Sequence, residues 1–220
     1  MHRTTIALAG AVTFALGLAS TPADAQLASR PAAEWKATLE APARVEGLKI
    51  DQVVKALKLK DGDVVADLGA GTGLFEPQLG YAIGRGRVYA VEIDAGFFPE
   101  IKKRAADAQV SNVETVLGKF TDPALPVKSI DVALFHDVIH HVENRAAYIK
   151  TLAGYLAPSG RIVVVDYEGG RGPHRDQPAL EVTREQLAGW MKDAGLSQIE
   201  DVKMFPDKYF LVFALAATRH

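Results

Sequence analysis

Short apolar runs alternate along this chain with longer segments in which apolar residues recur every three or four positions. Residues 64–67, 88–92 and 161–167 predict strands that are buried on both faces of a sheet. Residues 112–118 and 129–135 predict two further strands. The longer segments predict amphipathic helices, and they cover residues 49–59, 75–83, 97–108, 144–156 and 183–195. Strands that alternate with helices favour an α/β fold with a doubly wound parallel sheet.

The end of the chain departs from this alternation. Residues 198–205 and 209–216 both have the composition of strands, and the turn residues Pro206-Asp207-Lys208 separate them. This pattern predicts a terminal β-hairpin. The length of 220 residues suits one domain with a single core, and the sequence contains no internal repeat.

The first residues have the pattern of a secretory signal. A positively charged start precedes an apolar run of roughly 13 residues, and Ala23-Asp24-Ala25 fits a cleavage site. We therefore predict a signal peptide at 1–25, an N-terminal arm at 26–44 and one domain at 45–220, with export to the periplasm. An uncleaved segment that anchors the chain to a membrane is the alternative. No later segment has the about 20 apolar residues that a membrane span needs, so none is expected in the mature chain.

Charge and cysteine content exclude several classes of function. The formal net charge is −2, with both signs interspersed, and the chain has no cysteine. The charge argues against a nucleic-acid-binding surface. The absence of cysteine excludes a disulfide framework, a thiolate metal site and a cysteine nucleophile. We therefore expect neither a nucleic-acid partner nor thiol chemistry.

A glycine-rich loop follows the first predicted strand. Asp67 ends the strand, and Gly69-Ala70-Gly71-Thr72-Gly73 leads into a helix. Glycines permit positive φ angles and a close approach of a ligand, and a helix N-terminus attracts negative groups. A dinucleotide fingerprint would place its third glycine at position 74, where this chain has Leu74. The spacing therefore disfavours a nicotinamide-dependent oxidoreductase.

Polar residues also follow the second and fourth predicted strands. Glu92 ends the second strand and Ile93 follows it, and a carboxylate at this place can accept hydrogen bonds from both hydroxyls of a ribose. The fourth strand leads into His136-Asp137-Val138-Ile139-His140-His141. Ligands of doubly wound sheets lie outside the carboxyl ends of the strands, where the strand order reverses. We therefore expect this histidine-rich cluster to face a bound ligand.

Three interpretations of the cluster are open. A histidine titrates near neutral pH, so His136, His140 or His141 could act as a base, and His136 and Asp137 lie nearest the strand end. A histidine could instead hydrogen-bond loop backbone and position the cluster. The residue types also suit a metal ion, but the adjacent His140 and His141 would diverge on a regular helix. We therefore expect no metal site.

The G-x-G-x-G loop with its preceding acid resembles motif I of the class I S-adenosylmethionine-dependent methyltransferases, and the likeness extends over residues 45–215. The histidine-rich run is similar to the segment after strand four in small-molecule members. This resemblance implies a mostly parallel seven-stranded sheet with an antiparallel C-terminal strand. It also implies S-adenosylmethionine as cofactor and a small-molecule or lipid-like methyl acceptor. The implied cofactor-binding residues are Asp67, Gly69, Ala70, Gly71, Gly73, Glu92, Ile93, Asp122 and His136. The implied catalytic residues are His136, Asp137, His140 and His141.

One position departs from the family pattern. An acid that meets the adenine amino group commonly follows the glycine after the third strand, but Lys119 follows Gly118 here. Either Asp122 or the backbone around Phe120 then takes that role. The alternative function is an exported, non-catalytic binding protein on a methyltransferase fold. The sequence leaves the acceptor and the oligomeric state open.

Overall fold

A computed structural model describes residues 31–169 and 171–216. The predicted signal peptide and its cleavage after Ala25 lie outside the described residues. Export therefore stays a prediction. No helix in the described ranges is long and apolar enough to cross a membrane.

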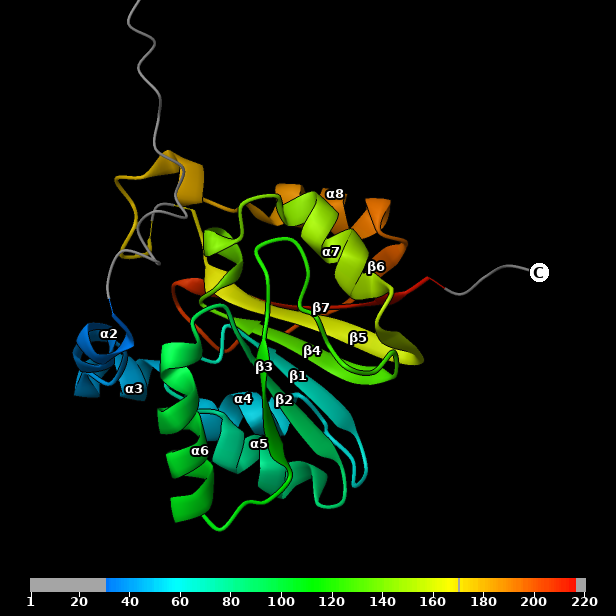
Figure 1. The fold of residues 1–220 in the computed structure, drawn as a ribbon. Coiled ribbons are helices and arrows are strands. Elements are labelled where there is room, and N and C mark those ends of the chain that lie inside the picture. Colours follow the sequence, from blue (N-terminus) through cyan, green and yellow to red (C-terminus); the bar gives the residue numbers. More distant parts are fainter. Residues whose placement is uncertain (1–30, 170, 217–220) are drawn as a thin grey trace, which may run out of the picture.

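The described chain is built on one seven-stranded sheet with the order β3-β2-β1-β4-β5-β7-β6 (Figure 1). The strands are β1 (Val64–Leu68), β2 (Arg87–Glu92), β3 (Val113–Leu117), β4 (Ile130–His136), β5 (Leu156–Tyr167), β6 (Leu196–Asp201) and β7 (Lys208–Leu215). Strands β1 to β5 pair in parallel, and β7 lies antiparallel between β5 and β6. The predicted doubly wound sheet, its antiparallel C-terminal strand and the terminal hairpin are confirmed.

Helices cover both faces of the sheet (Figure 1). They are α4 (Ile50–Ala56), α5 (Glu76–Ile83), α6 (Phe98–Asp107), α7 (Arg145–Ala153) and α8 (Arg184–Asp193). One core cluster joins the sheet to α4 and α5, and the other joins its opposite face to α7 and α8. The start of α8 has the capping box that its sequence predicts, between Thr183 and Gln186. Burial of apolar side chains on both faces thus fixes the sheet between two helical layers.

The N-terminal arm is helical where the structure describes it. It forms α2 (Ala32–Leu39) and the first residues of α3 (Pro42–Leu48), so the predicted boundary after residue 44 falls inside a helix. Two ion pairs hold α2 against α6 (Phe98–Asp107). The ammonium of Lys36 in α2 lies 2.7 Å from the carboxylate of Glu100, and the carboxylate of Glu40, just after α2, lies 2.5 Å from the guanidinium of Arg104. The arm therefore sits beside the carboxyl ends of the strands.

The fifth strand begins earlier than its sequence predicts. Apolar periodicity and Pro158-Ser159-Gly160 predict a helix as far as residue 156 and a strand from 161, but the helix ends at Ala153 and β5 already begins at Leu156. A Cβ atom at Gly160 would lie 2.4 Å from the carbonyl oxygen of Ile130. Only glycine permits this close approach of two strands, so the glycine belongs to an irregular strand start rather than to a helix end.

Candidate active site

The carboxyl ends of β1, β2 and β4 open into a cavity of about 890 Å³. Its polar lining includes Asp67, Glu92, Lys119, His136 and His141, and its apolar lining includes Leu48, Leu74, Phe75, Phe97, Phe120 and Tyr148. Trp35 and Leu39 of α2 also line it. The volume falls near the upper end of the roughly 300–1,000 Å³ that small-molecule sites occupy.

The glycine loop forms one wall of this cavity in a conformation that needs glycine. Gly69 has a φ of +76°, and a Cβ atom there would lie 2.6 Å from a side-chain methyl of Val138. The backbone N–H groups of Gly69 and Ala70 donate to the carbonyl of Val91, and that of Gly73 donates to the carbonyl of Ala70. These N–H groups therefore bond within the protein. The loop contributes its shape to the cavity.

Glu92 joins the loop to the end of β2. One carboxylate oxygen accepts from the N–H of Gly71 at 2.9 Å, and the other accepts from the N–H of Ile93 at 2.8 Å. Burial raises the pKa of Glu92, and these N–H groups oppose that rise. Each carboxylate oxygen can accept a second hydrogen bond. Glu92 lines the cavity and thus keeps the acceptor capacity that two ribose hydroxyls require.

A second carboxyl group lies near Asp67 beneath the loop. Glu76 is fully buried at the start of α5, and neither of its carboxyl oxygens has a hydrogen-bond partner among the described residues. Burial and the nearby charge of Asp67 raise the pKa of Glu76 well above its usual value. Burial, together with the charge of Glu92, raises the pKa of Asp67 to about 7. At mildly acidic pH the folded protein therefore holds protons here that the unfolded chain has released.

This pair predicts a stability that falls with rising pH. Because Asp67 and Glu76 bind more protons in the folded than in the unfolded state above about pH 4.5, their contribution to the free energy of unfolding decreases as the pH rises toward 7 and beyond. We expect this contribution to fall on the order of 1–3 kcal/mol between pH 5 and 8. His141 and His174, whose pKa values are lowered, contribute in the opposite direction. Glu76→Gln removes one titrating group and should flatten this dependence in urea unfolding curves. The same change at the exposed Glu114 is the matched control. A pH dependence of stability that is the same in Glu76→Gln as in the wild type would contradict the prediction.

The structure splits the predicted histidine-rich cluster. His136 and His141 line the large cavity. The buried imidazole of His136 lies between Phe75 and Phe205, with ring centroids 5.0 and 6.0 Å away. Neither of its nitrogens has a hydrogen-bond partner among the residues that the structure describes. A buried polar group of this kind is typically satisfied by a ligand or water.

Asp137 has a different environment. Its backbone φ is 58°, and its carboxylate lies 2.7 Å from the ammonium of Lys208 and 3.6 Å from Nδ1 of His136. Burial acts to raise the pKa of Asp137, but His136 and Lys208 outweigh it and bring that pKa well below its usual value. The lining described for the cavity does not include Asp137. The geometry places this carboxylate in a buried ion pair.

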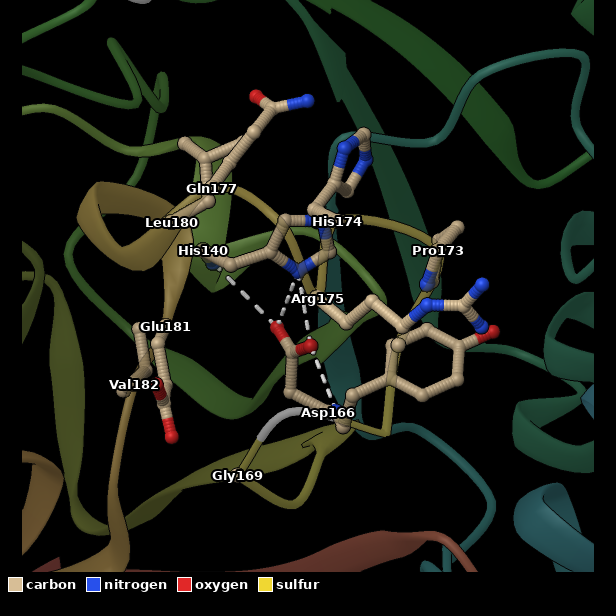
Figure 2. Close-up of a pocket in the computed structure, with 12 residues that line it drawn as sticks. His140, Asp166, Gly169, Pro173, His174, Arg175, Gln177, Leu180, Glu181 and Val182 are labelled. Carbon is tan, nitrogen blue, oxygen red and sulfur yellow. Dashed lines mark hydrogen bonds and ion pairs between the residues drawn. The ribbon is translucent and has the colours of Figure 1, made fainter.

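His140 also turns away from the large cavity. Its Nδ1 lies 2.8 and 2.9 Å from the two carboxylate oxygens of Asp166, at the end of β5 (Figure 2). The two residues line a separate cavity of about 30 Å³. Burial, followed by the positive charge of His140 and His174 when they are protonated, lowers the pKa of His141 to about 3. His141 is therefore neutral at neutral pH and a weak base, which leaves His136 as the better candidate for a base.

The segment after β3 also separates the two candidates for the adenine contact. Lys119 and Phe120 line the cavity. The carboxylate of Asp122 instead accepts from the hydroxyl of Tyr155 at 2.9 Å and from the N–H of Ala124 at 2.7 Å, and the described lining of the cavity does not include it. The geometry therefore favours the backbone around Phe120 over Asp122.

Sequence reasoning missed several residues of the site. Glu76, Lys208 and Asp166 are absent from the predicted set, and their partners lie 9, 71 and 26 positions away in the chain (Asp67, Asp137 and His140). Of these three residues, only Asp166 could have been predicted from the sequence. It is an acid near the carboxyl end of a parallel strand, where ligands of such sheets bind.

The comparisons with known proteins agree with this geometry. Residues 66–164 match the family model described as a methyltransferase domain. This range includes the glycine loop, Glu92 and the residues from His136 to His141. The matched range of the chain is similar to a methyltransferase domain. This match agrees with the resemblance of the sequence to S-adenosylmethionine-dependent methyltransferases.

The curated relatives of this chain are distant. Phosphoethanolamine N-methyltransferase 1 of Arabidopsis thaliana is 29% identical over 156 residues, which are 67% of this chain and 31% of the relative. An uncharacterized methyltransferase of Mycobacterium tuberculosis is 26% identical over 117 residues, which are 53% of this chain and 57% of the relative. The chain thus spans about a third of the length of the first relative and less than two thirds of the second.

Solved structures show the same fold. A SAM-dependent methyltransferase from Aquifex aeolicus superposes with a TM-score of 0.73 at 21% identity, over 84% of this chain and 98% of that chain. The magnesium protoporphyrin IX methyltransferase of Synechocystis, solved with bound SAM, gives a TM-score of 0.61 at 18% identity, over 78% of this chain and 80% of that chain. At these sequence identities the likeness establishes the fold and does not identify a methyl acceptor.

Proposed function

We propose that this protein transfers a methyl group from S-adenosylmethionine to a small, largely apolar or lipid-like acceptor. The observation that carries the proposal is the cavity of about 890 Å³. The glycine loop and Glu92 line it, and so do Phe75, Phe97 and Tyr148. The cofactor needs the glycine loop and the carboxylate, and the aromatic side chains favour an apolar acceptor.

The residues present fit this cofactor. Glu92 offers carboxylate oxygens at the end of β2, and the glycine loop, whose Gly69 packs against Val138, lines the cavity beside it. When bound, S-adenosylmethionine supplies a methyl group on an already activated sulfonium. The protein then has mainly to position the acceptor, and positioning alone can contribute about 7–11 kcal/mol.

His136 has the chemistry to assist an acceptor that carries a proton. Its imidazole is buried, lines the cavity and has no hydrogen-bond partner among the described residues. It can accept a proton from an acceptor hydroxyl or amine as the new bond forms. Phe75 and Phe205 hold the ring on both sides, so the imidazole is oriented before the acceptor binds.

Calorimetric titration with S-adenosylmethionine and, separately, NAD tests the cofactor. We expect S-adenosylmethionine to bind with a dissociation constant on the order of micromolar, about −8 kcal/mol, and NAD not to bind. A screen with radiolabelled methyl donor against small phenols, amines and fatty acids then tests transfer. No binding by a folded sample would contradict the proposal. Binding without transfer to any acceptor would favour the alternative of a non-catalytic binding protein.

A further inference from the structure

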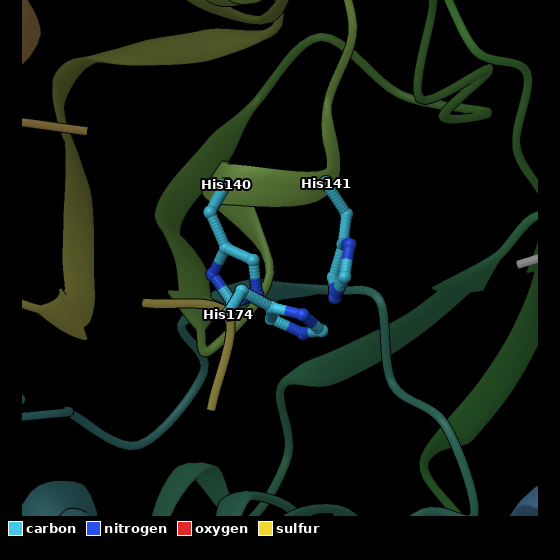
Figure 3. Close-up of side chains that lie close together, drawn as sticks. All are labelled: His140, His141 and His174. Atoms are coloured by element: carbon cyan, nitrogen blue, oxygen red, sulfur yellow. The ribbon is translucent and has the colours of Figure 1, made fainter. Parts of the chain in front are cut away.

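Three imidazoles converge beside the large cavity (Figure 3). His140 and His141 belong to a short 3₁₀ helix (Ile139–His141) after β4, and His174 comes from the long loop after β5. The ring centroids of His140 and His141 lie 4.1 Å apart, and that of His174 lies 5.4 and 5.1 Å from them. The expectation that the adjacent histidines diverge is wrong, because the segment is a 3₁₀ turn rather than a regular helix.

The side-chain nitrogens of this cluster have metal-binding geometry. One ring nitrogen from each of His140, His141 and His174 lies within 4.8 Å of the other two. A tetrahedral zinc ion with bonds of about 2.0–2.1 Å needs ligand nitrogens roughly 3.3 Å apart. The rings therefore have to move together by about 1.5 Å at most, which small side-chain rotations supply.

Asp166 orients the first of these imidazoles. Because its carboxylate binds Nδ1 of His140 at 2.8 Å, Nδ1 carries the proton of a neutral ring and Nε2 is left as the electron-pair donor. A carboxylate that holds the far nitrogen of a ligating histidine is the usual second layer of protein zinc sites. Asp166 is itself buried, so its negative charge also offsets part of the charge of a cation.

The backbone around the cluster is held in place. The guanidinium of Arg145 donates to the carbonyl oxygens of Ile139, His140 and Ala179, at distances of 3.1, 2.5 and 3.0 Å. It thereby ties the 3₁₀ turn to the end of the loop that carries His174. The adjoining cavity of about 30 Å³ exceeds the 10–15 Å³ that one water molecule needs.

We propose that His140, His141 and His174 bind a divalent first-row transition metal ion of the zinc type. Imidazole ligands select such ions over Mg²⁺ and Ca²⁺, which prefer oxygen. Three protein ligands leave a fourth position for water or for another oxygen. Since His141 also lines the large cavity, the ion lies at the border between the two cavities. It is thereby in a position to polarise an acceptor oxygen if the proposed methyl transfer holds.

Metal binding by the full chain tests this inference without any measurement of methyl transfer. The untagged protein, with the terminal His2 and His220 replaced by glutamine, is stripped with a chelator and titrated with Zn²⁺ by calorimetry and with Co²⁺ by visible absorption. We expect one ion per chain and the intense visible bands of four-coordinate Co²⁺. His141→Gln and His174→Gln should each weaken Zn²⁺ binding at least tenfold, and Asp166→Asn should weaken it about 10–100-fold.

His136→Gln is the matched control, since it removes a nearby imidazole that lies outside the cluster, and it should bind Zn²⁺ like the parent protein. Circular dichroism confirms that each variant is folded. Absence of stoichiometric Zn²⁺ binding by the folded parent protein would overturn the proposal. So would equal affinity in the parent, His141→Gln and His174→Gln proteins. Titration of the same samples with S-adenosylmethionine reports separately on the proposed function.

Discussion

Replacing Lys208 with methionine is expected to lower the free energy of unfolding by about 3–5 kcal/mol. The ammonium of Lys208 lies 2.7 Å from the carboxylate of Asp137, and the two side chains are only 5% and 7% exposed. Methionine keeps the length of the apolar stem but leaves the negative charge of Asp137 buried without its cation. Urea unfolding at neutral pH measures the loss.

Two further variants make this prediction specific. Asp137→Asn combined with Lys208→Met removes both charges and should recover much of the lost stability, since asparagine tolerates the positive φ of position 137. Lys203 pairs with Asp201 at 2.6 Å but is 75% exposed, so Lys203→Met should change stability by less than about 1 kcal/mol. A Lys208→Met protein as stable as Lys203→Met would show that the buried pair is not needed.

Replacing Glu92 with alanine is expected to weaken S-adenosylmethionine binding roughly 100-fold or more. Hydrogen bonds to a charged group contribute about 1.5–3 kcal/mol each, and two ribose hydroxyls share this carboxylate in the proposed complex. The substitution also removes the acceptors for the N–H groups of Gly71 and Ile93, so the glycine loop loses a support. Calorimetric titration measures the dissociation constant.

The control for this change is Glu114→Ala, which removes an exposed glutamate from the neighbouring strand β3. It should bind the cofactor like the wild type. Glu92→Gln keeps the shape and one carbonyl acceptor and should fall between the two. If Glu92→Ala retained wild-type affinity, the carboxylate would not contact the cofactor, and the proposed orientation of the ribose would be wrong.

Local sequence predicts the frame of this protein well. The apolar runs that end at Asp67, Glu92 and His136 are all strands, because residues buried on both faces of a parallel sheet have to be apolar in succession. The spacing of Gly69, Gly71 and Gly73 is equally local, because a turn with positive φ selects glycine whatever surrounds it. The prediction fails at Leu156, where a long-range contact between Gly160 and Ile130 extends the strand.

The tertiary structure alone decides what the residues after β4 do. Neighbouring histidines and acids in the sequence predict one cluster, but the positive φ of Asp137 and the 3₁₀ turn that follows send them to different partners. His136 lines the large cavity, Asp137 pairs with Lys208, and His140 pairs with Asp166.

The sequence by itself therefore determined the fold class, the position of the glycine loop and the resemblance to methyltransferases, since these depend on periodicity and spacing between near neighbours. The division of the polar cluster, the buried carboxyl group of Glu76 and the approach of His174 to His140 were decided only by the tertiary structure. Charge pairing and ligand geometry depend on distances of a few ångströms between segments far apart in the chain, and no local pattern encodes those distances.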